Sequence, residues 1–310
     1  MNLKNISTTS KIRWVGTILS LVLLVYLIRH NWGELVLAVQ KIAISSLLLG
    51  LLLMLISRLA VGSRWHILLR VTDFDVTWGK TQRITFAGLF ASNFLPTTIG
   101  GDVVRLAGAV QYRMDGAISA ASLIVDRLVG MFGMALVLPL GIPQLWEWLS
   151  ARNSSGDDIS SGLAISATFS KWWQRGTSVL KRVWHSLALW RGQPRSLLIS
   201  LIFTGIHQLC LYLIIQLFLR DLGESLPFWQ IPGIWSFIYF VTLLPISING
   251  YGVQELALTF FFSQVAGVSE SSALAVAVLI RTIQMLASLP GAAFLPSIMA
   301  GERNEEPNDG

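Results

Sequence analysis

The amino-acid sequence predicts an all-α fold, in the form of a polytopic helical bundle that is integral to a membrane. Three observations favour this class. Charged residues form 13% of the 310-residue chain, about half of the roughly 25% that is usual in soluble domains. Hydrophobic residues form 53% of it and the mean hydropathy is +0.62, which excludes an ordinary soluble globule of this size. Long apolar runs also recur along residues 1–310, which we expect to form a single transmembrane domain.

The apolar runs supply the expected spans, since a helix needs about 20 residues to cross roughly 30 Å of hydrocarbon. They cover residues 14–28, 42–69, 84–110, 117–140, 197–219, 233–266 and 273–300. No small-residue cleavage site follows the first run, so we interpret it as a retained anchor. Two runs are interrupted, one at 96–101 by Pro96 and a glycine pair, the other at 245–250 by Pro245 and an Asn-Gly pair. Each is predicted to hold two half-helices, which gives about seven to eight spans in all.

The two interrupted segments resemble each other, because proline, isoleucine and a final glycine recur in 94–101 and 243–250 at a constant offset. Each is followed by an apolar helix that carries an arginine, Arg127 in the first case and Arg281 in the second. Broken helices in two units of opposite orientation are typical of inverted-repeat transporters. We therefore expect two inverted repeats, at about 42–140 and about 197–300, joined by a loop at about 141–196.

The distribution of basic residues predicts the orientation in a bacterial inner (plasma) membrane, because lysine and arginine concentrate in cytoplasmic loops. The N-terminal stretch carries Lys4, Lys11 and Arg13, so we expect a cytoplasmic N-terminus. The loop at 141–196 should also be cytoplasmic, since it carries seven basic residues: Arg152, Lys171, Arg175, Lys181, Arg182, Arg191 and Arg195. If each broken segment makes one net crossing, the acidic tail after residue 300 lies outside. If the broken segments are re-entrant, this parity changes.

Within that loop, residues 171–190 have the pattern of an amphipathic helix. Tryptophan and leucine recur on one side at about helical spacing, and lysine and arginine supply the other side. A helix of this kind lies in the interface of an anionic leaflet. We therefore expect residues 171–190 to attach to an anionic membrane surface, either as a simple anchor or in contact with the substrate.

Several charged residues fall inside the apolar runs, where an ionised side chain costs about 2.5–3.5 kcal/mol and so normally has a partner or a function. Four are arginines and three are carboxylates: Arg58, Arg105, Arg127, Arg281, Asp102, Asp126 and Glu255. This net positive interior suits an anionic ligand, most simply a phosphate. The net charge of +6 is thereby explained by the membrane, and no nucleic-acid partner is expected.

The first glycine pair favours an anion site. Gly100 and Gly101 open a helix predicted to begin at Asp102, where free N–H groups and the helix dipole attract negative charge. Arg105 lies one turn further on the same face. Two roles remain open for the arginines of the apolar runs, which either bind the ligand or pair with the carboxylates to hold the bundle together. For Asp102 and Glu255 we favour capping or pairing.

Other chemistry is weakly indicated. His207 has no second His or Cys at ligand spacing, so we expect it to form an interhelical hydrogen bond rather than a metal site. Asp73 and Asp75 form a D-x-D pair, which we interpret as part of a solvated loop. The sequence has no phosphate-binding glycine–lysine loop, no paired cysteines and no His-Glu-x-x-His motif. We therefore expect neither a metal nor a cofactor.

Three stretches together resemble the signature sequences of one family. They are NFLPTTIGGDVVR at 93–105, DRLVG at 126–130 and LPISINGYGVQE at 244–255. The family is the membrane domain of lysylphosphatidylglycerol synthase, also called multiple peptide resistance factor, together with its stand-alone, flippase-like relatives. The resemblance extends over about residues 10–300. Asp102 departs from the glutamate often seen after the glycine pair.

The resemblance implies a domain that moves a lipid across the bilayer. In two-domain members, a soluble C-terminal domain makes the aminoacylated lipid. Because the chain stops at Gly310, we expect no aminoacyl transfer and no enzymatic activity. The resemblance does not fix the lipid, since relatives are associated with phospholipid, polyprenyl-linked sugar and hopanoid pathways.

Carried over residue by residue, the resemblance and the intramembrane charges give two sets of candidate site residues. The candidate lipid-phosphate ligands are Arg105, Arg127, Arg281, Gly100, Gly101, Asn93 and Asn249. The structural or coupling candidates are Asp102, Asp126, Glu255, Pro96 and Pro245.

The leading hypothesis is a lipid transporter that binds an anionic or headgroup-modified lipid and moves it between leaflets. Two alternatives remain open. One is a membrane transferase that uses a lipid-phosphate donor, with Asp102, Asp126 or Glu255 as the base. The other is an accessory subunit that recruits a lipid-modifying enzyme through the basic, tryptophan-rich loop.

Overall fold

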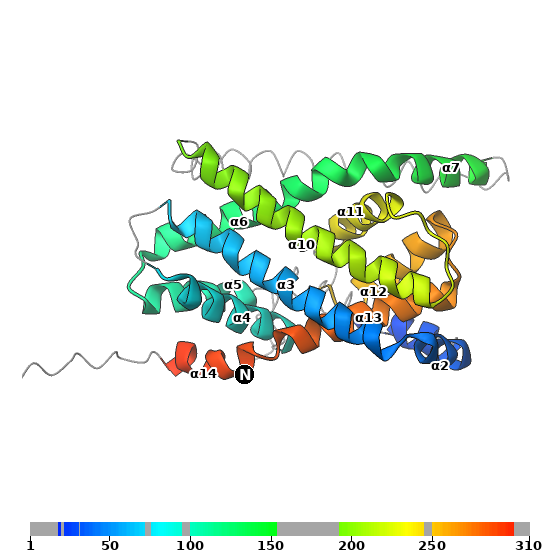
Figure 1. Ribbon diagram of the computed structural model, residues 1–310, viewed down its shortest axis with the longest axis horizontal. Helices are drawn as coiled ribbons and strands as arrows, with labels where there is room; N and C mark the ends of the chain where they lie inside the picture. Colours follow the sequence, from blue (N-terminus) through cyan, green and yellow to red (C-terminus); the bar gives the residue numbers. More distant parts are fainter. Residues whose placement is uncertain are drawn as a thin grey trace, which may run out of the picture.

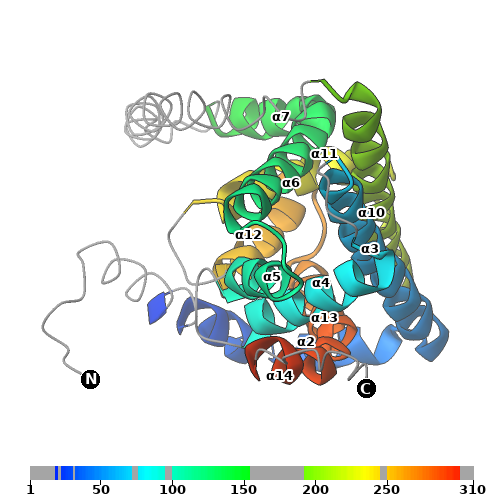
Figure 2. The same cartoon turned by 90° about the vertical axis from the view of Figure 1, so that its left-hand side faces the viewer.

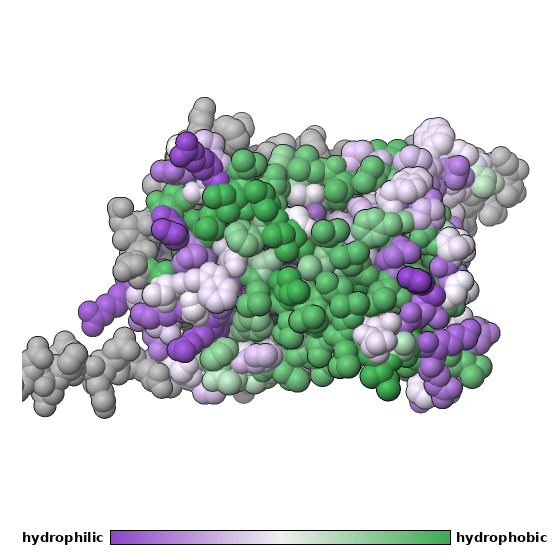
Figure 3. Space-filling model, in the orientation of Figure 1, coloured by the Kyte–Doolittle hydropathy of each residue, from purple (hydrophilic) through white to green (hydrophobic). Residues whose placement is uncertain are grey.

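The computed structural model describes residues 18–19, 22–30, 32–71, 76–94, 100–153, 192–244 and 250–300. Within these ranges every regular element is a helix, so the all-α prediction is confirmed for the described chain. Large apolar side chains remain exposed on the outer faces of the longest helices, for example Leu48 at 63% and Leu198 at 61%. Figure 3 shows the resulting apolar band between two polar ends. A contiguous apolar belt of this kind identifies an integral membrane protein.

Four described helices are long and apolar enough to cross a bilayer, with mean hydropathies between 1.5 and 2.2. They are α3 (Ile44–Leu69), α6 (Gly116–Val137) with its continuation, α10 (Pro194–Asp221) and α13 (Glu270–Ser288). The continuation of α6 is a short 3-10 turn, η2 (Leu138–Gly141), followed by α7 (Ile142–Asn153). A fifth candidate is a bent pair, Val22–His30 and α2 (Trp32–Lys41). The described chain therefore holds four or five candidate spans, against the seven to eight expected from the sequence.

The two interrupted segments account for part of this difference, because each folds back on itself. Gly88 of α4 (Trp78–Phe94) packs against Gly101 of α5 (Gly100–Gln111), and Ile84 packs against Gly108. Figures 1 and 2 show these two helices side by side. Residues later in α4 contact residues earlier in α5, so the two helices are antiparallel and form a hairpin rather than one continuous crossing.

The second interrupted segment has the same form. It consists of α11 (Gln230–Thr242), α12 (Val253–Phe260) and a π-helical turn, η4 (Phe261–Val265). The rings of Phe237 on α11 and Phe261 on η4 stack at 5.9 Å, which brings the return of the hairpin beside its start. Within the described residues, the packing of both segments favours the re-entrant alternative over one net crossing. Pro96, Pro245 and Asn249 lie outside the described residues.

The longest helices, α3 and α10, lie against each other and run in opposite directions (Figure 1). Gly50 of α3 faces Phe218 of α10, Ser57 bonds to His207, and Leu68 packs near Leu197. Small residues such as Gly50 and Ser57 let the two backbones approach closely, as is usual for helices packed within a membrane.

Helices α6 and α10 run in the same direction. Val125, near the middle of α6, packs in one cluster with Leu197 near the start of α10, and Met134 meets Tyr212 further along both helices. The chain between α6 and α10 therefore joins opposite ends of the bundle, and α7 occupies its first residues. This differs from the expected arrangement, in which the whole stretch at 141–196 forms a cytoplasmic loop. The amphipathic segment predicted at 171–190 lies outside the described residues.

The two ends of the bundle carry opposite charge. At the end where α3 finishes and α6 and α10 begin, called here the basic end, the described charges are Arg70, Lys80, Arg83, Arg113, Arg195 and Asp115. At the end where α3 begins and α10 finishes, called here the acidic end, they are Glu34, Glu147, Asp221, Glu224, Glu270, Arg29, Lys41, Arg152 and Arg220. The last described helix, α14 (Gly291–Ala300), lies towards the basic end, where Gln111 Nε2 donates to the Ser297 carbonyl at 3.0 Å.

Glu224 connects the α10–α11 link to the start of α13 at the acidic end. Its Oε1 accepts hydrogen bonds from Ser269 Oγ at 2.5 Å and from Ser269 N at 3.3 Å. Partial burial by itself raises the pKa of Glu224. The hydrogen bonds from Ser269 and Ser272 and the charge of Lys41 outweigh that effect and hold the pKa below its ordinary value of 4.5.

Candidate functional site

A chain of ion pairs joins α3, α5 and α6 inside the bundle. Its centre is Asp126, which is 1% exposed. One carboxylate oxygen accepts from Arg64 Nε at 2.6 Å, and the other accepts from Arg105 Nη2 at 3.1 Å. Arg105 also lies 3.6 Å from Asp102, which accepts a hydrogen bond from Arg127 Nε at 2.7 Å. Three arginines thus share two carboxylates, and the network fixes the fold-back segment of the first half against α3.

Packing around Arg105 strengthens its structural role. Its guanidinium carbon lies 4.4 Å from the centroid of the Trp65 ring, a cation–π contact that gains strength where water is excluded. Trp65 Nε1 in turn donates to Ser122 Oγ at 3.0 Å. The pairing role is therefore the one that the structure gives Arg105, Asp102 and Asp126.

Arg127 and the glycine pair have comparable roles. Arg127 is paired with Asp102, and its side chain is 61% exposed, so it does not point into an enclosed ligand site. Helix α5 begins at Gly100, two residues before the predicted start. A Cβ atom on Gly101 would overlap Ser92 Oγ, which shows that a glycine is needed here for close packing of α4 and α5.

Arg64 is the member of this network that the sequence analysis missed. It is 8% exposed and donates to Thr204 Oγ1 of α10 as well as to Asp126. Its position within the run at 42–69 was a usable signal. Since it lies near the end of that run, however, it resembles the many arginines whose side chains extend to lipid headgroups.

A second ion pair lies in the other half of the molecule. Arg281 of α13 donates through Nε to Glu255 Oε1 of α12, and its guanidinium carbon lies 4.9 Å from the Tyr251 ring centroid. Glu255 is 4% exposed, which confirms the expected pairing. The pair is incomplete, because neither Arg281 Nη2 nor Glu255 Oε2 has a hydrogen-bond partner among the described atoms.

The two fold-back segments meet near the middle of the bundle. Tyr251, just before α12, donates its hydroxyl hydrogen to the Asn93 carbonyl at the end of α4. The Asn93 side chain donates through Nδ2 to Ser288 Oγ of α13 at 3.0 Å. Asn93, a candidate ligand, is therefore placed where both halves of the chain touch.

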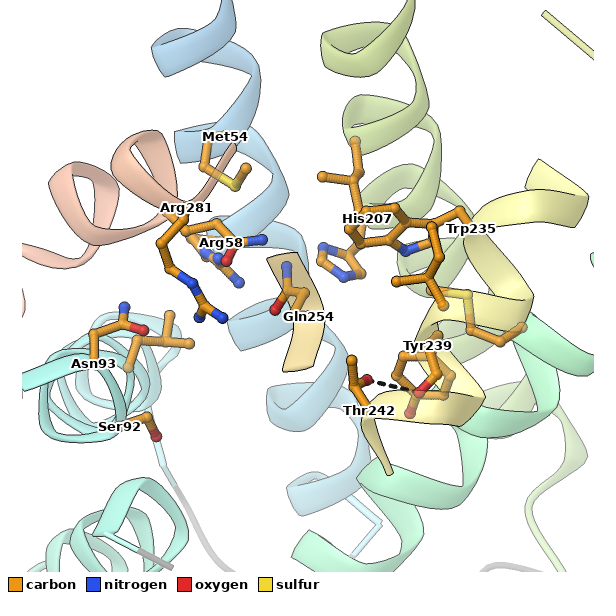
Figure 4. A pocket seen from close by; sticks show the side chains of 15 residues that line it. Met54, Arg58, Ser92, Asn93, His207, Trp235, Tyr239, Thr242, Gln254 and Arg281 are labelled. Carbon is orange, nitrogen blue, oxygen red and sulfur yellow. Dashed lines mark hydrogen bonds between the residues drawn. The ribbon is translucent and has the colours of Figure 1, made fainter. Parts of the chain in front are cut away.

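A cavity of about 290 Å³ opens at this meeting point. Its apolar lining residues are Met54, Leu89, Met134, Leu211, Trp235 and Ile238. Its polar lining residues are Arg58, Ser92, Asn93, His207, Tyr239, Thr242, Gln254, Arg281 and Gln284. Figure 4 shows Arg58, Arg281 and Gln254 pointing towards one another in the cavity.

The charge of this cavity is incompletely balanced. Arg58 of α3 has a buried Nε atom that finds no hydrogen-bond partner in the described part of the chain. His207, which faces it from α10, shares a hydrogen bond of 2.6 Å with Ser57 Oγ, so the predicted interhelical bond is confirmed. Two guanidinium groups and one nearby carboxylate leave one positive charge over, and buried charge of this kind requires a counter-ion. The cavity is therefore suited to hold an anion.

The structure divides the candidate ligands. Arg281 and Asn93 line the cavity, together with Arg58, which the sequence analysis placed among the intramembrane charges but not among the ligands. Arg105 and Arg127 are paired with carboxylates away from it. Within the described ranges, no three His, Cys, Asp or Glu side chains are grouped so as to hold a metal ion.

Comparison with known proteins agrees with the motif resemblance. No curated protein matches the sequence. The family model described as the lysylphosphatidylglycerol synthase TM region matches residues 13–291. That match includes the four long helices, both fold-back segments and all of the described residues that line the cavity. The chain is a member of the lysylphosphatidylglycerol synthase transmembrane-region family.

Proposed function

We propose that the protein binds the anionic headgroup of a membrane lipid in this cavity and moves the lipid between the two leaflets. The observation that carries the proposal is the convergence of Arg58 and Arg281 on one cavity with too little negative charge to balance them. A phosphate is the anion that a membrane supplies in quantity, and paired guanidinium groups bind it with charge-assisted hydrogen bonds.

The order and direction of the helices support a transport mechanism. The chain passes twice through the same sequence of elements, a long helix, a fold-back pair and a second long helix. Helices α3 and α10 run in opposite directions, as do α6 and α13 (Figure 1). We interpret these units as two inverted repeats with a central site, the arrangement that permits alternating access from the two membrane faces.

The charge of the two ends supports an orientation in the bacterial inner membrane. The basic end would face the cytoplasm, with the end of α14 on that side. Cysteines introduced at Arg195 and at Glu270, in a Cys210→Ser background, test this with an impermeant thiol reagent on intact cells. Labelling of the Arg195 position and not of the Glu270 position would reverse the orientation.

Leaflet exchange in reconstituted vesicles tests the transport function. The vesicles contain phosphatidylglycerol labelled on an acyl chain, and a membrane-impermeant quencher follows its appearance in the outer leaflet. Arg58→Gln removes one cationic partner of the phosphate, so exchange should slow by at least about tenfold, the effect of one hydrogen bond to a charged group. Arg70→Gln, an exposed change at the basic end, serves as the matched control.

Arg58→Gln is informative because it breaks no ion pair among the described residues, so folding should be retained. Equal exchange rates for the wild type, Arg58→Gln and Arg281→Gln would overturn the proposed mechanism. Exchange that is lost in Arg70→Gln as well would show an effect of surface charge and not of the cavity.

A second function is favoured by one observation. Glu255 Oε2 is buried beside the cavity without a hydrogen-bond partner among the described atoms, and a free carboxylate oxygen can act as a general base. The protein would then be a transferase that uses a lipid-phosphate donor. Product formed by the purified protein from such a donor, and lost in Glu255→Gln, would favour the enzyme. The accessory-subunit alternative depends on residues 171–190 and stays a prediction.

A further inference from the structure

We infer that the cavity selects lipids whose headgroup combines a phosphate with uncharged hydroxyl groups, and that it excludes headgroups that carry an added ammonium group. The inference rests on the proposed function and specifies its cargo. It separates the two kinds of cargo that the sequence left together, an anionic lipid and a lipid whose headgroup has been modified with a basic amino acid.

The first argument is the sign of the charges that face the cavity. Arg58 and Arg281 line it and lie within electrostatic reach of each other. None of the described residues that line it is acidic. The nearest carboxylate, Glu255, is already bound to Arg281 Nε. An ammonium group in this space would meet two guanidinium groups at low dielectric and find no carboxylate of its own, whereas a phosphate diester would balance the excess charge.

The second argument is the chemistry of the neutral lining. The cavity presents three amide side chains, from Asn93, Gln254 and Gln284. An amide offers both a donor and an acceptor, and a hydroxyl group needs both. The Asn93 Nδ2 group is occupied by Ser288, which leaves its carbonyl oxygen as an acceptor for a hydroxyl hydrogen. Amides and guanidiniums together therefore match a phosphate that bears a polyol.

The third argument is size. A cavity of about 150 Å³ holds one benzene, with about six non-hydrogen atoms, so the 290 Å³ found here holds roughly twice that number. A phosphoglycerol headgroup has about ten such atoms. Esterification with lysine adds about nine more, so the lysyl group would have to extend out of the cavity through its open side. The acyl chains must remain outside the cavity, in the bilayer.

The test exchanges one neutral lining group for a charged group of the same shape. Gln254 points towards Arg58 and Arg281 (Figure 4), and Gln254→Glu gives the cavity a carboxylate. The matched control is Gln264→Glu, the same change at an exposed position on η4. Each protein is reconstituted in phosphatidylcholine vesicles. Leaflet exchange is then measured for acyl-labelled phosphatidylglycerol, its lysyl ester and phosphatidylcholine.

We expect the wild type to exchange phosphatidylglycerol at least about tenfold faster than the lysyl ester, since like charges at close quarters weaken binding by at least this factor. Gln254→Glu should shift the ratio of the two rates towards the lysyl ester by a similar factor, and Gln264→Glu should leave it unchanged. Thermal unfolding in detergent is measured for all three proteins to show that they are folded.

The possible failures are distinguishable. If the wild type exchanges the lysyl ester as fast as phosphatidylglycerol, the selectivity inference is overturned while the transport function stands. If no labelled lipid exchanges, the proposed function itself fails. The thermal stability of the solubilised protein is also measured with inorganic phosphate alone. If phosphate stabilises the solubilised protein as much as phosphatidylglycerol does, the cavity is a site for small anions and both assignments are overturned.

Discussion

Asp126 is the residue whose replacement should most strongly destabilise the bundle. Asp126→Asn keeps the shape of the side chain and removes its charge. Arg64 then loses its carboxylate, and Arg105 keeps only the longer contact of 3.6 Å to Asp102. Removing one partner of a buried ion pair destabilises a protein by about 3–5 kcal/mol, because the remaining charge is left uncompensated. We expect a loss of this size in the free energy of unfolding.

Asp102→Asn is the matched control. Asp102 takes part in the same network, but its side chain is 23% exposed and its partner Arg127 is 61% exposed. Ion pairs that water reaches contribute about 0.2–1 kcal/mol. The same chemical change should therefore have a several-fold smaller effect at Asp102 than at Asp126.

Both variants are measured by reversible unfolding in mixed micelles, with helical content as the signal. A double variant, Arg64→Gln with Asp126→Asn, removes one of the two stranded cations and should recover part of the stability. The account of the network would be refuted if Asp126→Asn were no more destabilising than Asp102→Asn. It would also be refuted if Arg64→Gln and Asp126→Asn had strictly additive effects.

Two further predictions concern other contacts. Glu224 has a lowered pKa, so its contribution to stability is present above its ordinary pKa of 4.5 and disappears as the pH falls through the lowered value. When the pH is lowered from about 6 to about 3, the melting temperature should therefore fall less in Glu224→Gln than in the wild type. The exposed control Glu147→Gln should behave like the wild type. An equal fall in all three proteins would contradict the stabilising role of the Glu224 carboxylate. A Cβ atom on Gly233 would collide with the backbone of Gly141, so Gly233→Ala should lower stability by about 1–3 kcal/mol. A Cβ atom on Gly205 would meet no other atom within 4 Å, so Gly205→Ala should not lower stability. Equal effects of the two substitutions would contradict the close packing of Gly233 on Gly141.

Much of the fold could be predicted from hydrophobicity, because long helices depend on a property that can be summed along the chain. The runs at 42–69 and 197–219 correspond to α3 and α10 within a few residues at most of their ends. The interruptions at Gly100 and Gly250 were also found in the right places. Whether the chain continues or turns back at such a break depends on tertiary packing, here of Gly88 on Gly101, and hydropathy contains no information on that choice.

The candidate site was predicted in part. Of the residues that the sequence offered as ligands, Arg281 and Asn93 line the cavity, and Glu255, for which pairing was favoured, is paired with Arg281. The sequence could not show which arginines already have a counter-ion, because that depends on how the helices pack. Arg105, for example, pairs with Asp126 of a different helix. Arg58 received no role as a ligand for a related reason. Its solitary position in α3 becomes informative only when α13 places a second arginine on the same cavity.

The ion pair between Arg64 and Asp126 also bears on how the protein is made. The two residues are 62 positions apart, so at about 5–20 residues per second the ribosome adds Asp126 roughly 3–12 s after Arg64. By its mean hydropathy of 2.2 alone, helix α3 would leave the translocon before its counter-ion exists, but the unpaired Arg64 opposes this. During that interval we expect it to stay beside the translocon, where water can reach its arginines. Site-specific crosslinking of arrested chains would measure this, and early release of α3 into lipid would show that the pair is not needed for insertion.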